Sequence, residues 1–344
     1  MTESPADLAA LFPLFDVLEQ GRSVALVPIG GVGPGDVAPP TEPGPWIGVT
    51  SSGSTGRPKL VWRRWPELRA GASRRPEVQR WRWASPYGPS SFAGVQVALQ
   101  AWATSREIVS WHARTWDEVW ASVRQERIDA VSGTPTFLDL MVQSEGQPGS
   151  EWQPVQVTLG GEPLRPGVGR RLRARFPGTR FIVIYASAEF GVLMRTERLD
   201  GWYEAASLAR RWPEWRIRDE VLEVADHGTW RATGDRVVAQ GDLLKVVGRA
   251  DQVANIAGTK VDLAGIIELA EQVPGVLRAV AVAESSPITG QIVCLRYALD
   301  PHQPAEAIEA LLQEQLRASL PKAAWPRRWV RDAVAPVKNA KRAV

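Results

Sequence analysis

Short apolar segments alternate with amphipathic segments along the first half of the chain. Apolar residues recur at helical spacing over 93–102, 116–126 and 166–176. Between these predicted helices lie runs of four to six mostly apolar residues, which we interpret as strands: 46–50, 107–110, 130–133, 155–159 and 180–185. The alternation predicts an α/β fold with a mostly parallel sheet. Before it, the sequence predicts a helix over 6–19 and a strand over 23–27.

The pattern changes after residue 202. Short β-like runs separated by turn residues predict an antiparallel sheet or small barrel, with strands at 215–217, 221–224, 236–239 and 243–247. After Gly248 the order becomes helix, strand, strand, helix, over 263–271, 277–283, 291–299 and 305–319. This last part is a small α+β unit. We therefore predict a large core domain, 1–250, followed by a small C-terminal domain, 251–344.

Composition narrows the class of protein only slightly. The 344 residues are 44% hydrophobic and 23% charged, with a net charge of +3 and a single cysteine, Cys294. An apolar run holds Cys294, which predicts a buried strand thiol and excludes an internal disulfide. No apolar run approaches the roughly 20 residues of a membrane span, and the N-terminus lacks the basic region of a secretory signal. We expect a cytoplasmic protein.

Arginine and tryptophan alternate between residues 62 and 83. Such a segment could stack bases and neutralise phosphates. Pro66 and Glu67 are typical of a helix start, so we favour a helix with an apolar tryptophan side and a solvated arginine side, and we expect no nucleic-acid partner. The three histidines, His112, His227 and His302, lie far apart in the sequence and predict no metal site.

A glycine- and serine-rich loop follows the apolar run at 46–50. The loop reads Thr50-Ser51-Ser52-Gly53-Ser54-Thr55-Gly56-Arg57-Pro58-Lys59. Its glycines allow successive backbone N–H groups to point into one anion-binding concavity, to which Lys59 adds a positive charge. The spacing is not that of a P-loop. The loop is therefore a candidate phosphate site, although a plain turn would share its composition.

This loop resembles the signature loop of the adenylate-forming superfamily, which includes acyl- and aryl-CoA synthetases, peptide adenylation domains and luciferases. Further segments resemble the motifs of that family in the same order: Gly160-Gly161-Glu162, Tyr185-Ala186-Ser187-Ala188-Glu189, Thr233-Gly234-Asp235, Gly248-Arg249-Ala250-Asp251, Ala257-Gly258-Thr259-Lys260 with Glu268, and Pro336-Val337-Lys338-Asn339-Ala340-Lys341. Together they cover residues 46–344. The set is far more specific than any one of its members.

The resemblance implies a role for each motif. Ser52, Gly53, Ser54, Thr55, Gly56 and Lys59 would hold the ATP phosphates. Gly160, Gly161, Glu162, Tyr185, Ala186 and Ser187 would surround the adenine and the α-phosphate, and Asp235 and Arg249 would bind the ribose. Glu189 would bind Mg²⁺, Asp251 would be the hinge between the domains, and Lys341 would be the catalytic lysine.

The sequence also departs from the family. Ala188 replaces a threonine that hydrogen-bonds the α-phosphate, a contact of roughly 1.5–3 kcal/mol, for which Ser187 or a water is a candidate substitute. Alanines stand in place of glycines at 186 and 340, and Gln252 in place of a common acidic residue. The loop also begins at residue 51, so we expect a shortened N-terminal region. That region often carries the dimer surface in the family, and the sequence leaves a homodimer open.

The resemblance implies a two-step reaction, in which a carboxylic acid attacks ATP to form an acyl-adenylate and the acyl group then passes to a thiol of CoA or of a phosphopantetheinyl carrier protein. Ser91, Phe92, Gly94 and Gly191 are candidate pocket residues. Small, apolar and aromatic residues around them favour an aryl or medium hydrophobic acid. The alternative is a degenerate AMP- or ATP-binding protein of the same fold without ligase activity.

Overall fold

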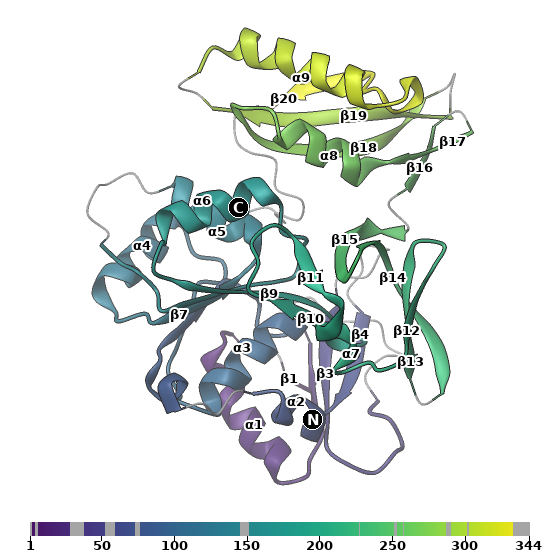
Figure 1. Cartoon of the computed structure of the whole chain (residues 1–344). Coiled ribbons are helices and arrows are strands. Elements are labelled where there is room, and N and C mark those ends of the chain that lie inside the picture. The colour runs from purple at the N-terminus through teal and green to yellow at the C-terminus, as the bar shows by residue number, and fades with distance from the viewer. Residues whose placement is uncertain are drawn as a thin grey trace. The chain divides into compact units, whose positions relative to one another are not determined.

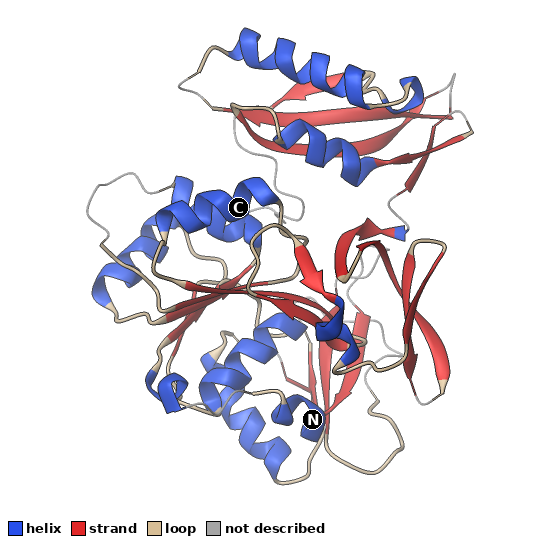
Figure 2. Ribbon diagram, viewed as in Figure 1, coloured by secondary structure: helices blue, strands red, loops and turns tan. Residues whose placement is uncertain are grey.

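We describe the protein from a computed structural model, shown in Figures 1 and 2. The structure describes residues 2–3, 6–27, 38–51, 59–72, 76–144, 151–226, 228–250, 253–256, 258–286, 290–300 and 303–332. The chain forms two compact units. One contains Met1–Pro213 with Gly241–Leu244, and the other contains Glu214–Gln240 with Lys245–Val344.

A six-stranded sheet forms the centre of the first unit, with strand order β10-β9-β8-β7-β5-β6. All neighbouring strands are parallel except β10, which pairs antiparallel with β9 at one edge. The predicted α/β fold with a mostly parallel sheet is confirmed, whereas the edge strand β10 was not predicted. The bounds are β5 Trp83–Ser85, β6 Ile108–Ser110, β7 Ala130–Gly133, β8 Gln156–Leu159, β9 Arg180–Ser187 and β10 Gly191–Thr196.

Helices cover both faces of this sheet. Figure 1 shows α4, α5 and α6 on one face and α3 on the other. Side-chain caps fix the first turns of two of these helices: Thr115 and Glu118 form a capping box at α4, and Thr134 accepts a hydrogen bond from the backbone N–H of Phe137 at α5. The bounds are α3 Phe92–Trp102, α4 Trp116–Gln125, α5 Pro135–Gln143, α6 Pro166–Arg175 and, after strand β11 (Trp202–Glu204), α7 Ala205–Ala209.

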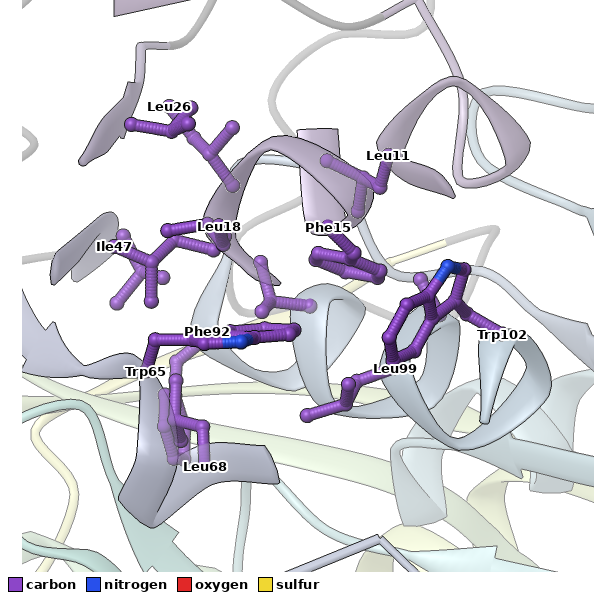
Figure 3. Close-up of a cluster of buried hydrophobic side chains, with 14 of the residues drawn as sticks. Leu11, Phe15, Leu18, Leu26, Ile47, Trp65, Leu68, Phe92, Leu99 and Trp102 are labelled. Atoms are coloured by element: carbon purple, nitrogen blue, oxygen red, sulfur yellow. The ribbon is translucent and has the colours of Figure 1, made fainter. Parts of the chain in front are cut away.

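A second, four-stranded sheet holds the strand predicted at 46–50. Its order is β1-β2-β3-β4, with β3 and β4 forming an antiparallel hairpin. An apolar core packs between this sheet and helices α1, α2 and α3 (Figure 3), and its centre is a stack of Phe15 on Trp65 with ring centroids 5.3 Å apart. The bounds are β1 Thr2–Glu3, η1 Ala9–Leu11, α1 Phe12–Glu19, β2 Val24–Leu26, β3 Trp46–Ser51, β4 Lys59–Arg64 and α2 Trp65–Ala70.

The arginine- and tryptophan-rich segment, 62–83, is not the single helix that we predicted. It comprises the end of β4, helix α2, a 3₁₀ turn (η2, Pro76–Arg80) and the start of β5. Strand pairing between β3 and β4 overrides helical propensity up to Arg64. Trp65, Trp81 and Trp83 are buried in the core, so their rings are not available to stack on bases.

The second unit begins with strands β15, β14, β13 and β12, hydrogen-bonded in that order. After them come the β16–β17 hairpin and a three-stranded sheet, β18-β19-β20, with helices α8 and α9. Both helices have the predicted bounds, and strand β20 was not predicted. The bounds are β12 Trp215–Arg218, β13 Val221–Asp226, β14 Thr229–Gln240, β15 Leu243–Arg249, β16 Val253–Ile256, β17 Thr259–Asp262, α8 Leu263–Glu271, β18 Val276–Ser286, β19 Gly290–Leu299, α9 Ala305–Ser319, η4 Lys322–Ala324 and β20 Arg328–Arg331.

Cys294 lies in β19 and is 1% exposed, which confirms the predicted buried strand thiol. Burial, followed by its hydrogen bond to Glu284, raises the pKa of this thiol to about 11. None of the helices in the described ranges is long and apolar enough to cross a membrane.

Candidate nucleotide and acid site

The carboxyl ends of the parallel strands carry the predicted adenine-side residues. The chain leads from β5 outward to β6, then returns across β5 to β7 and continues to β8 and β9, so the winding reverses between β5 and β7. Ligands of open α/β sheets bind outside the carboxyl ends of the strands at such a reversal. Tyr87 follows β5, Thr134 follows β7, and Gly160 follows β8.

The segments at these strand ends form a rim, and Tyr87 holds Gly160, the first glycine of that rim. Its hydroxyl donates a hydrogen bond to the carbonyl of Gly160 at 2.9 Å. Burial, and secondarily the charge of Glu162, raises the pKa of Tyr87 well above its ordinary value. The phenol therefore stays protonated and remains a donor. Tyr87 was not among the predicted site residues, although its position within the region predicted to form the parallel sheet was an available signal.

Glu162 fixes the other end of the turn that Gly160 begins. Its carboxylate accepts a hydrogen bond from the backbone N–H of Thr136, in the first turn of α5, at 2.5 Å. A carboxylate at a helix N-terminus also interacts favourably with the helix dipole. Between the two anchors, Gly161 has φ +83°, a conformation that favours glycine. The turn Gly160-Gly161-Glu162 is thus held from both sides.

The β9–β10 hairpin carries the second motif predicted to surround the adenine, Tyr185 to Glu189. Tyr185, Ala186 and Ser187 end β9, and the Ser187 hydroxyl accepts a hydrogen bond from the backbone N–H of Phe190 at 3.1 Å. Ala188 is 6% exposed and belongs to the apolar core of Figure 3, so its methyl group packs inward. The Ser187 hydroxyl retains its proton for donation.

Glu189, at the tip of this hairpin, is exposed. Its backbone carbonyl accepts a hydrogen bond from Nη1 of Arg63 in β4, while no ion pair to its carboxylate occurs within the described ranges. A carboxylate oxygen of this kind suits Mg²⁺, which binds through one or two carboxylates together with substrate phosphates and water. No group of three or more His, Cys, Asp or Glu side chains able to hold a metal occurs in the described part of the chain.

Within the second unit, Asp235 and Arg249 lie together. Nη1 of Arg249 is 3.4 Å from a carboxylate oxygen of Asp235 and donates to the carbonyl of Thr233, also at 3.4 Å. The Thr233 hydroxyl donates to the carbonyl of Leu222 and accepts from the backbone N–H of Asp235. These bonds hold the backbone of β14 around Gly234, which has φ +77°.

Several predicted residues lie outside the described ranges: Ser52, Gly53, Ser54, Thr55, Gly56, Asp251 and Lys341. The ends of the phosphate-loop segment are described. Ser51 ends β3 and pairs with Lys59, which begins β4 and is exposed. The backbone N–H of Thr50 donates to the carbonyl of Ser90 at 2.8 Å, so the end of β3 lies beside the N-terminus of α3.

A pocket of about 760 Å³ runs along the first unit between α3 and the sheet. Phe92 and Gly191, both predicted pocket residues, line it, as do Gly160 and Ala186 at the rim. Its further lining is partly apolar and partly polar: Ala93, Gln96, Val97, Gln100, Gln156, Thr158, Ile182, Ile184, Val192, Arg195 and Arg211, among others. The polar members were missed because no local pattern marks them.

Ser91 and Gly94, the other predicted pocket residues, hold the start of α3 instead of lining the pocket. Ser91 caps the helix by accepting from the backbone N–H of Gly94 at 3.0 Å and donates to the carbonyl of Gly88 at 2.6 Å. A Cβ at Gly94 would come within 2.2 Å of that carbonyl oxygen, so only glycine fits without displacement.

Residues 31–229 match the family described as AMP-binding enzyme. The match covers more than half of the 344 residues and includes the candidate phosphate loop and the strand-end rim. The chain belongs to the AMP-binding enzyme family. No curated protein matches this sequence significantly.

Solved structures of AMP-binding enzymes have the same fold. The anthranilate CoA ligase AuaEII in complex with anthranoyl-AMP is 14% identical with a TM-score of 0.66, over 85% of this chain and 64% of that one. A variant of E. coli MenE with bound OSB-AMS is 17% identical, with a TM-score of 0.65 over 93% and 75% of the two chains. The amide bond synthetase McbA from Marinactinospora thermotolerans is 18% identical, with a TM-score of 0.64 over 98% and 76%. The chain therefore spans about 64% of the length of the anthranilate CoA ligase.

The Tyr87 contact gives a prediction for this AMP-binding enzyme. Tyr87→Phe removes the donor to Gly160 and should lower the free energy of unfolding by about 1 kcal/mol while weakening AMP binding severalfold. Urea unfolding and titration with a fluorescent AMP analogue measure the two effects. Tyr203→Phe is the control, because Tyr203 is a buried tyrosine whose hydroxyl makes no hydrogen bond to any described residue. Equal AMP affinities in the two variants would contradict the role of Tyr87.

Proposed function

We propose that the chain uses ATP to convert a carboxylic acid into an acyl-adenylate, with release of pyrophosphate, and then transfers the acyl group to an acceptor. The observation that carries this proposal is the family match over residues 31–229, joined to a rim in which Gly160, Gly161 and Glu162 are fixed beside the β9–β10 hairpin. We assign Asp235 and Arg249 to the ribose and Glu189 to Mg²⁺.

The first step needs no general base. The acid is already ionised at neutral pH, so its oxygen can attack the α-phosphorus in line with the departing pyrophosphate. Catalysis then consists of positioning and of stabilising negative charge. The loop 51–59 would hold the phosphates, and Lys341 would bridge the attacking carboxylate and the α-phosphate. Bound Mg²⁺ would neutralise phosphate charge.

The second step requires the acyl-adenylate to meet an acceptor. We propose a thiol, of CoA or of a phosphopantetheinyl carrier protein, and a change in the position of the C-terminal domain (251–344) about Asp251 between the steps. An amine is the second candidate acceptor, because the structural relatives include an amide bond synthetase as well as a CoA ligase. Mass spectrometry of products formed with CoA, a carrier protein or an amine separates these acceptors.

Pyrophosphate exchange with a panel of aryl and medium-length carboxylic acids tests the first step directly. We expect exchange of labelled pyrophosphate into ATP that depends on both Mg²⁺ and one class of acid. ATP binding without exchange for any acid would instead establish the alternative, a nucleotide-binding protein of this fold without ligase activity.

A further inference from the structure

Arginine side chains gather on one wall of the acid pocket. Arg195 lies in the edge strand β10, opposite Ile184 of β9, and Arg210 and Arg211 follow helix α7. All three are exposed and line the pocket. The Ser207 hydroxyl ties α7 to β10, because it accepts from the backbone N–H of Arg195 and donates to its carbonyl.

The position of Arg211 is fixed by its neighbour. Trp212 packs edge-on against Phe190 in the β9–β10 hairpin, with ring centroids 6.0 Å apart. This contact places Arg211 beside Gly191. A Cβ on Gly191 would lie 3.4 Å from Nη2 of Arg211 and 3.3 Å from Nη2 of Arg63. Two guanidinium groups thus converge on one point of the hairpin, at a residue that lines the pocket.

Two of the three carboxylates that line the pocket are already paired with other arginines. Glu197 pairs with Arg180, with 2.9 Å between Oε1 and Nε. Glu67 pairs with Arg63 at 3.6 Å. Arg198 pairs with Asp200, and no ion pair of Glu204 occurs in the described ranges. The two pairs with Arg180 and Arg63 account for two of the three acidic residues in the lining, and Glu204 is the third.

Arg210 and Arg211 have no such carboxylate partner in the described ranges. Neither makes an ion pair or a side-chain hydrogen bond with any residue in the described ranges, and together they leave this wall with an excess of positive charge. Like charges held close together are destabilising unless an anion joins them. Helix α3 lines the pocket with the apolar residues Phe92, Ala93 and Val97, and with the uncharged polar residues Gln96 and Gln100. The pocket is therefore built for a ligand with an apolar body and a negatively charged group beside α7.

We infer that the acid substrate carries a second anionic group, such as a second carboxylate, which Arg211 binds on the β10–α7 wall. This inference rests on the proposed function and names the class of acid that the site would activate. The reacting carboxylate would lie at the rim formed by Gly160 and the β9–β10 hairpin, and the second anion would lie farther along the wall. An arginine fork matches a carboxylate in a bidentate geometry.

Matched acid pairs test the inference. Adipate and hexanoate, or isophthalate and benzoate, differ in one carboxylate, and exchange kinetics give kcat and KM for each. For the diacid of the preferred pair, Arg211→Gln should raise KM about tenfold or more, as expected for one lost charge-assisted hydrogen bond. The KM values for the monoacid and for ATP should not change. Arg124→Gln, which removes an exposed arginine of α4 outside the pocket, is the matched control and should change none of these values.

Calorimetry with the diacid alone separates this inference from the proposed function. Binding that Arg211→Gln weakens about tenfold or more and that Arg124→Gln leaves unchanged would support the anion site even if no acid gave pyrophosphate exchange. Two results would overturn the inference: a wild-type enzyme that does not prefer either diacid over its monoacid in exchange or in binding, or an Arg211→Gln variant whose only change is a higher KM for ATP, which would assign Arg211 to the nucleotide phosphates.

Discussion

Replacing Lys341 with alanine should slow acyl-adenylate formation by about a hundredfold to a thousandfold, the usual cost of removing one group that stabilises developing negative charge. The reason is the proposed bridge from its ammonium group to the attacking carboxylate and the α-phosphate. Thioester formation from supplied acyl-adenylate should survive, because that step does not need this charge. Pyrophosphate exchange measures the first step, and acyl transfer from synthetic adenylate measures the second.

Lys338→Ala provides the matched control, since it removes a lysine three residues earlier in the same motif. It should leave both half-reactions within a factor of about two. If Lys341→Ala left both half-reactions intact, the assignment of the catalytic lysine would be wrong.

Replacing Arg171 with alanine should lower the free energy of unfolding by about 3 kcal/mol. Arg171 of α6 donates two hydrogen bonds to the carboxylate of Asp139 of α5, at 2.8 and 2.7 Å, and the Asp139 side chain is only 2% exposed. Removal of the guanidinium leaves this carboxylate buried without its cation, which is the costly way to break such a pair. Denaturant unfolding of the purified variant measures the loss.

Two further variants separate the buried charge from a general loss of packing. Arg170→Ala changes the exposed neighbour on the same helix and should alter stability by no more than about 0.5 kcal/mol. The double variant Asp139→Leu, Arg171→Met removes both charges and should recover most of the lost stability. A double variant as unstable as Arg171→Ala would show that the ion pair is not the cause.

Local patterns were sufficient to predict the elements that bury one regular face. Helix α9, Ala305–Ser319, buries Ile308, Leu312 and Leu316, and this four-residue spacing is visible in the sequence. The parallel strands of the first unit appear as short apolar runs because helices cover both of their faces. The family motifs then supplied a candidate site that periodicity alone could not.

The elements and site residues that were not predicted depend on contacts between segments distant in the sequence. Whether residues 62–64 form a strand is decided by their pairing with β3, and Trp65 then packs into a core built by α1 and α3. Tyr87 and Gly160 are 73 residues apart in sequence, and only the order of the strands brings them into contact. In the same way, Arg211 joins the pocket through the packing of Trp212 on Phe190.

The properties of the single cysteine allow the proposed domain motion to be tested by spectroscopy. The Cys294 thiol is buried, and its pKa of about 11 leaves very little of the reactive thiolate at neutral pH. Maleimide dyes or spin labels should therefore not react with this thiol. They should react with cysteines introduced at exposed positions, such as Arg124 in α4 and Leu311 in α9. One label in each unit would report their separation before and after adenylate formation, without the native cysteine having to be removed.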